Sequence, residues 1–101
     1  MGRVESRIQA DIIGYLRGLD ATYVLNVGGG ASTAKGTPDL IVCHHGLFVS
    51  IEVKRPDSSY GVTKPQEIRM RQIRAAKGIA LVATSVSEVA TALAALREDR
   101  A

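Results

Sequence analysis

Hydrophobic residues recur at helical spacing over residues 4–19. This spacing predicts an amphipathic helix. Its apolar stripe consists of Val4, Ile8, Ile12, Tyr15, Leu16 and Leu19. At about 100° per residue, Glu5 falls roughly 40° from the centre of that stripe. We therefore expect the first helix to direct one carboxylate inward.

The pattern then changes to short runs rich in β-branched residues. It predicts strands over 22–27, 39–44 and 47–54, and the Gly- and Ser-rich stretch 28–38 is typical of an exposed loop. The last two strands flank His45-Gly46, a dipeptide suited to a two-residue hairpin turn. We interpret these two strands as a tight hairpin.

Two further helices and one strand are predicted in the C-terminal half. Helical patterns cover 65–78 and 85–99, and the apolar run 79–84 between them is typical of a buried strand. Two residue pairs have the spacing of a helix capping box, Thr63 with Gln66 and Ser85 with Glu88. The order α-β-β-β-α-β-α predicts an α/β fold, a four-stranded mixed sheet flanked by helices, in a single domain spanning 1–101.

The hairpin sets two acids against each other. If His45-Gly46 is the turn, His44 faces Leu47, and counting back along both strands places Asp39 opposite Glu52. Alternation gives the second strand one apolar face, made of Leu47, Val49, Ile51 and Val53, and a second face made of Phe48, Ser50, Glu52 and Lys54.

Two opposed carboxylates repel each other, and a divalent cation such as Mg²⁺ or Mn²⁺ would relieve that repulsion. Glu5 could supply a third oxygen. The alternative is a surface salt-bridge cluster of these acids with Lys54 or Arg55, which an E-x-K pattern alone would favour. The acid after a proline, the register and the inward Glu5 together favour the metal site.

Composition narrows the function classes. The chain has 101 residues, a net charge of +3 and one cysteine, Cys43. A lone cysteine excludes an internal disulfide framework and a cysteine zinc site, and we expect it to be a small apolar residue of a strand. No apolar run is long enough to span a membrane and the N-terminus lacks a signal-peptide pattern, so we expect a cytoplasmic protein with no membrane partner.

The sequence resembles the PD-(D/E)-x-K nuclease superfamily and, within it, the VRR-NUC domain. The matching residues are "GTPD" at 36–39, "IEVK" at 51–54, Gln66 in the following helix and Glu5 in the first helix. The similarity extends from about Glu5 to Val89, and the α-β-β-β-α-β order matches the superfamily's restriction-endonuclease-like core.

That resemblance implies roles for the matching positions. Lys54 would orient or activate water, and Gln66 would organise the site or touch the nucleic-acid backbone. Asp39, Glu52, Lys54 and Gln66 would form the catalytic set. The implied ligands of Mg²⁺ or Mn²⁺ are Glu5, Asp39, Glu52 and the backbone carbonyl of Val53.

The resemblance also implies a function, a metal-dependent DNA endonuclease. Stand-alone proteins of this kind tend to be homodimers that cut branched DNA such as four-way (Holliday) junctions, often from phage genomes, in which case the host cytoplasm is the expected location. The alternatives are a linear-duplex or flap nuclease of repair or restriction type, and a non-catalytic DNA-binding module.

Basic residues near the predicted site are candidates for DNA binding. An ordinary solvated helix face is the alternative for those on the second helix. Tyr60 could also touch substrate. The full candidate set is Lys35, Arg55, Tyr60, Lys64, Arg69 and Arg74.

Two other motifs are excluded as sites. Lys35 precedes Gly36, whereas a P-loop needs Gly-Lys-Ser/Thr, so we expect no nucleotide cofactor. His44 and His45 lie at the hairpin tip, and we expect turn residues there rather than ligands.

Overall fold

The computed structural model describes residues 3–27, 35–57 and 61–99, with side chains up to Arg97. Its elements follow the predicted order α-β-β-β-α-β-α. They are α1 (Arg3–Arg17), β1 (Thr22–Asn26), β2 (Leu40–His44), β3 (Leu47–Val53), α2 (Lys64–Ala75), β4 (Ile79–Ala83) and α3 (Val86–Asp99). Within these segments no helix has the length and apolar character needed to cross a bilayer.

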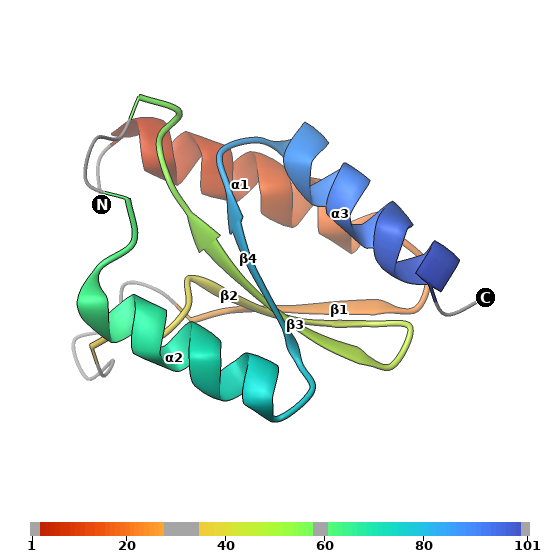
Figure 1. Ribbon diagram of the computed structural model, residues 1–101. Coiled ribbons are helices and arrows are strands. Elements are labelled where there is room, and N and C mark those ends of the chain that lie inside the picture. The colour runs from red at the N-terminus through yellow and green to blue at the C-terminus, as the bar shows by residue number, and fades with distance from the viewer. Residues whose placement is uncertain (1–2, 28–34, 58–60, 100–101) are drawn as a thin grey trace.

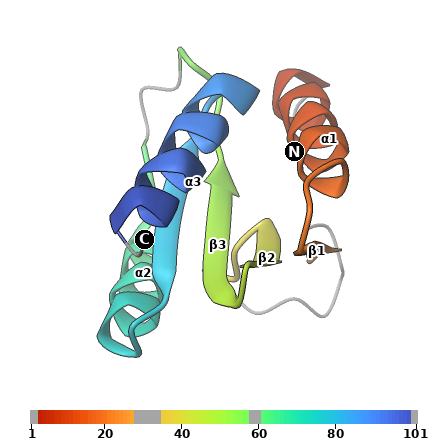
Figure 2. The ribbon, with the colours of Figure 1, turned by 90° about the vertical axis from the view of Figure 1, so that its right-hand side faces the viewer.

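The four strands form one mixed sheet in the order β1-β2-β3-β4. β1, β2 and β3 form an antiparallel meander, and β4 pairs parallel to β3 after the α2 crossover. α1 and α3 lie on one face of the sheet and α2 lies on the other (Figures 1 and 2). The predicted α/β fold is confirmed.

The β2-β3 hairpin has the predicted turn and register. His45 and Gly46 both have positive φ, 50° and 81°, which a two-residue turn of this hand requires. His44 pairs with Leu47, and the ladder continues to Leu40 opposite Ile51. One more step of this register brings Asp39 to the level of Glu52.

β3 separates the core from the α2 side of the sheet. Val49, Ile51 and Val53 are at most 1% exposed, and they belong to the core between the sheet, α1 and α3. The alternate residues face α2, and there Ser50 and Glu52 are 1% and 2% exposed. The apolar face was predicted, and on the other face Ser50 and Glu52 are as deeply buried, whereas Phe48 is 46% exposed.

α1 departs from the predicted stripe at its first turn. Val4 is 46% exposed, so its place in the apolar stripe was wrong. The residues of α1 that are buried are Gln9, Ile12 and Leu16, because the packed part of the helix begins more than a turn after its start. Gln9 is tied to the sheet, since its Nε2 donates to Asn26 Oδ1 at 2.9 Å.

The first turn of α2 packs closely against the loop that precedes β2. Gly36 has φ 82°, and a Cβ on it would lie 2.6 Å from the carbonyl carbon of Pro65. Only glycine tolerates both that backbone conformation and that approach. Gly36 therefore holds the loop leading to Asp39 against the helix that begins beside Glu52.

Gly36→Ala should destabilise the protein more than Gly46→Ala does. Both glycines have φ near 80°, but a Cβ on Gly46 would meet nothing within 4 Å. The control thus carries the conformational cost alone, about 1–2 kcal/mol, and Gly36→Ala adds the clash with Pro65. Chemical denaturation of both variants measures the difference, and equal losses would contradict the close approach.

Candidate active site

Glu52 is a carboxylate buried between β3 and the start of α2. It lies in the β3-β4 ladder opposite Val82, so the sheet holds its backbone. Its side chain is buried, and Oε2 accepts a hydrogen bond from Gln66 Nε2 at 2.9 Å. Among the described residues its other oxygen, Oε1, is buried with no hydrogen-bond partner. Gln66 therefore holds one oxygen of this carboxylate, and the other is buried without a partner in the described structure.

This environment disfavours the ionised form of Glu52. Burial, and then repulsion from Asp39, raises its pKa to about 7, and the positive charge of Lys54 offsets only part of the shift. A buried anion of this kind requires a compensating positive charge. The predicted repulsion between Asp39 and Glu52 is therefore present.

Asp39 stands immediately before β2 and connects three strands. Its backbone carbonyl accepts from the Val27 N–H at 3.0 Å, and its Oδ2 accepts from the Val53 N–H at 2.8 Å. Burial raises the pKa of Asp39, opposed by the Val53 hydrogen bond and by the charge of Lys54. The side chain is thus fixed against β3 at the point where Glu52 lies.

Lys54 follows directly after β3 and brings a positive charge to both acids. Its N–H donates to the Ala83 carbonyl at 3.0 Å, which fixes its backbone. Its charge lowers the pKa of Asp39 and of Glu52. The structure therefore brings Asp39, Glu52, Lys54 and Gln66 together near the end of β3.

Glu5 approaches this end of the sheet from α1, on the opposite face from α2. It is partly buried, and its charge is a lesser cause of the raised pKa of Asp39. Among the residues that the structure describes, no three His, Cys, Asp or Glu side chains gather closely enough to hold a metal ion. The ligand set of Glu5, Asp39, Glu52 and the Val53 carbonyl therefore stays a prediction.

The donor chemistry nevertheless fits a hard divalent cation. Mg²⁺ and Mn²⁺ prefer carboxylate and carbonyl oxygens. Asp39 and Glu52 supply two carboxylates, and Glu52 Oε1 is a buried oxygen without a partner in the described structure.

Two of the predicted DNA contacts are in exposed ion pairs. Arg55 Nη2 lies 2.9 Å from Asp57 Oδ2, and Lys64 Nζ lies 3.8 Å from Glu67 Oε2. Exposed pairs of this kind contribute roughly 0–1 kcal/mol, so a phosphate could replace the carboxylates.

The other predicted DNA contacts are placed differently. Arg74 Nη2 donates to the Ala80 carbonyl at 2.8 Å, which ties α2 to β4. Arg69 is exposed on α2 and Lys35 is exposed at the end of the loop before β2. Tyr60 lies outside the described residues.

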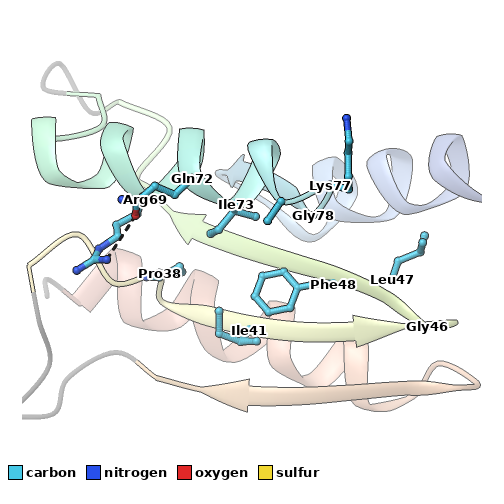
Figure 3. A pocket seen from close by; sticks show the side chains of 11 residues that line it. Pro38, Ile41, Gly46, Leu47, Phe48, Arg69, Gln72, Ile73, Lys77 and Gly78 are labelled. Carbon is cyan, nitrogen blue, oxygen red and sulfur yellow. Dashed lines mark hydrogen bonds between the residues drawn. The ribbon is translucent and has the colours of Figure 1, made fainter.

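Arg69 also lines a groove between α2 and the hairpin, shown in Figure 3. The groove has a volume of about 760 Å³. Arg69 and Lys77 stand toward its two ends, and its apolar lining includes Pro38, Ile41, Phe48 and Ile73. It lies on the face of the sheet that carries Glu52.

The last two residues of β2 lie as follows. Cys43 is a strand residue, as expected, and its side chain is exposed between two buried neighbours. His44 is the last residue of β2 rather than a turn residue, and it is 3% exposed. Its Nδ1 is 2.7 Å from Thr22 Oγ1, and burial lowers its pKa.

The residue that sequence reasoning left out of the site is Thr63. It was identified only as half of a helix cap, and the structure shows that its partner in that cap, Gln66, also binds Glu52. The capping spacing was the available signal. What the sequence lacked was the direction of the Gln66 side chain.

Comparison with solved structures identifies the fold. One structure described as a VRR_NUC domain has a TM-score of 0.71 and 20% identity, over 91% of this chain and 96% of the other. A second, a VRR_NUC domain protein, has a TM-score of 0.70 and 21% identity, over 92% and 87% of the two chains. No protein-family model and no curated protein matches the chain. The fold is that of VRR-NUC domain structures.

Without added metal, the wild-type protein should lose stability as the pH rises from 5 to 8. A carboxyl whose pKa is higher in the folded than in the unfolded chain binds its proton more tightly when folded, so folding weakens between its two pKa values. The pKa of Glu52 is 4.5 in the unfolded chain and about 7 in the folded protein. This difference lowers the free energy of unfolding by about 3 kcal/mol. Denaturation in EDTA at both pH values measures the loss.

Glu52→Gln should remove most of this dependence, because an amide does not titrate. Asp11→Asn, on the exposed face of α1, is the matched control and should keep the wild-type dependence. If Glu52→Gln and the wild type lost equal stability between the two pH values, Glu52 would not carry the buried charge.

Proposed function

We propose that the chain belongs to the VRR-NUC family and is a metal-dependent endonuclease that hydrolyses phosphodiester bonds in DNA. The observation that carries this proposal is Glu52, a buried carboxylate with one oxygen held by Gln66 and the other unpaired in the described structure, beside Asp39. The fold shared with VRR-NUC domain structures supports it.

Asp39 and Glu52 would hold Mg²⁺ or Mn²⁺, together with the Val53 carbonyl and with Glu5 turned toward them. When bound, such a cation polarises a phosphoryl oxygen and lowers the pKa of a bound water. Hydrogen bonds already orient both carboxylates without the cation, because the Val53 N–H binds one Asp39 oxygen and Gln66 binds one Glu52 oxygen.

Lys54 would act on the water and on the phosphate. Its charge acts on both carboxylates, and we expect its ammonium to reach a substrate phosphate held beside them. There it orients the attacking water and counters the negative charge that grows on the phosphoryl oxygens. Gln66 keeps Glu52 in place while this occurs.

The DNA backbone would lie across the start of α2 and the loops beside it. Lys35, Arg55, Lys64 and Arg69 are exposed cations there, and Arg74 and Tyr60 complete the proposed contacts. The net charge of +3 favours a polyanionic partner, and such binding weakens as salt rises. We further propose that the substrate is branched DNA, cut by a homodimer that brings two active sites to one junction.

Purified protein with Mg²⁺ or Mn²⁺ should nick DNA, and EDTA should stop the reaction. Asp39→Ala and Lys54→Ala should each reduce the nicking rate about 100-fold or more. The first removes a proposed metal ligand, and the second removes the ammonium beside the attacking water. Lys77→Ala is the control, because Lys77 follows the C-terminal end of α2 whereas Gln66 lies in its first turn, and it should cut normally. A gel-based nicking assay with circular dichroism of each variant measures both activity and folding.

An Asp39→Ala or Lys54→Ala protein that cuts as fast as the wild type would contradict the proposed mechanism. DNA binding without cleavage by the wild type, with either metal, would instead favour a non-catalytic DNA-binding module.

A four-way junction should be nicked faster than a linear duplex of the same sequence. The protein should also elute as a dimer, at twice the chain mass of 10.7 kDa. Junction, flap and duplex substrates compared at one protein concentration, with light scattering on the same sample, measure both. Equal rates on junction and duplex would overturn the branched substrate, and a monomer that still cuts would overturn the dimer.

A further inference from the structure

The side chain of Gln66 binds two partners at opposite ends of its amide. Its Oε1 accepts from the Thr63 N–H at 2.9 Å, and its Nε2 donates to Glu52 Oε2 at 2.9 Å. A backbone N–H only donates and an ionised carboxylate only accepts, so both contacts require the same orientation of the amide. Rotating the amide by half a turn would lose both bonds together.

Thr63 holds this arrangement from the other side. It is the N-cap of α2, with φ −77° and ψ 164°, and its Oγ1 accepts from the Gln66 N–H at 3.3 Å. Backbone and side chain of Gln66 are therefore both bound to Thr63. An exposed helix cap is connected to a buried carboxylate through a single side chain.

The Gln66 contact makes the two oxygens of Glu52 different from each other. The β3-β4 ladder holds the backbone of Glu52, and the Gln66 contact fixes Oε2 on the α2 side. Oε1 is thereby left to face a ligand, and it has no other hydrogen-bond partner in the described part of the chain. If Gln66 turned away, either oxygen of the carboxylate could take either position.

We propose that Thr63 is a positioning residue of the metal site, which acts through Gln66 to present Glu52 Oε1 to the cation. This inference rests on the proposed function, because it concerns the same site. Thr63 touches neither substrate nor metal. Thr63 affects the orientation of Glu52 only through its hydrogen bonds to Gln66.

The close approach of Gly36 to Pro65 adds a second connection at the same turn. Pro65 precedes Gln66 in α2, and Gly36 lies three residues before Asp39. The first turn of α2 is thus packed against the loop of one carboxylate and hydrogen-bonded to the other. Loosening this turn would therefore disturb both proposed ligands of the cation.

The test is a double-mutant cycle between Thr63 and Gln66, read out as Mn²⁺ affinity by calorimetry. Gln66→Met keeps the volume and removes both amide bonds, and should weaken binding about tenfold or more. Thr63→Ala should weaken it at least about threefold, with Thr63→Ser restoring wild-type affinity because the serine hydroxyl caps equally well. In the Gln66→Met background, Thr63→Ala should have no further effect.

Ser85→Ala is the matched control for lost helix capping. Ser85 Oγ accepts from the Glu88 N–H at 3.2 Å at the start of α3, so this variant removes an equivalent cap away from Glu52. It should lower the unfolding midpoint as Thr63→Ala does and leave Mn²⁺ affinity unchanged.

In metal-free samples, NMR should show slow solvent exchange of the Gln66 side-chain amide in the wild type and fast exchange in Thr63→Ala.

The outcomes separate the two claims. If the wild type binds Mn²⁺ but Thr63→Ala binds it as tightly as Ser85→Ala does, or if the two substitutions are additive, Thr63 is only a helix cap and this inference is overturned. If the wild type binds no Mn²⁺, the proposed function fails and this inference fails with it, whatever the amide exchange shows.

Discussion

Glu52 places an ionisable carboxylate in the protein interior, between β3 and the first turn of α2, where Gln66 binds one of its oxygens and burial raises its pKa to about 7. Burying a charge without a partner is unfavourable, and Asp39 beside it adds repulsion instead of relief. Much of the surrounding structure can be understood from that constraint. Lys54 supplies a positive charge near both acids, the Val53 N–H donates a hydrogen bond to Asp39, and the Gln66 amide donates one to Glu52.

The sheet allows this unfavourable arrangement because β3 has two different faces. Its apolar residues pack against α1 and α3 and stabilise the fold, while its polar residues turn toward α2. The hairpin register fixes which residue goes to which face, because a slip of one residue would send Glu52 into the apolar core. Packing of the apolar face of β3 therefore keeps Glu52 on the opposite face, toward α2.

Local signals predicted much of this structure from the sequence. The His45-Gly46 turn determined the register, strand alternation placed Glu52 and Lys54 together, and the spacing of Thr63 and Gln66 predicted the start of α2. These features depend on neighbouring residues or on one strand pair. That is why pattern and spacing were sufficient.

The errors came from packing between distant elements. Val4 was predicted to be buried and is exposed, because where α1 meets the sheet is not encoded in its own periodicity. Burial of Gln9 depends on Asn26 in β1, and the hydrogen bond from Arg74 to Ala80 depends on how α2 lies over β4. The third carboxylate, Glu5, comes from the opposite face of the sheet, and the helical wheel that placed it inward could not give its distance from Asp39.

The proposed mechanism depends on Asp39 and Glu52 binding one divalent cation together. A crystal of the wild-type protein grown with Mn²⁺ tests this most directly, through the anomalous scattering of the metal. We predict a peak within about 2.6 Å of Glu52 Oε1 and of an Asp39 oxygen, the range of hard cations bound to oxygen, with Gln66 still bound to Glu52 Oε2. A peak elsewhere, or a carboxylate pair that binds no metal at saturating Mn²⁺, would contradict the account.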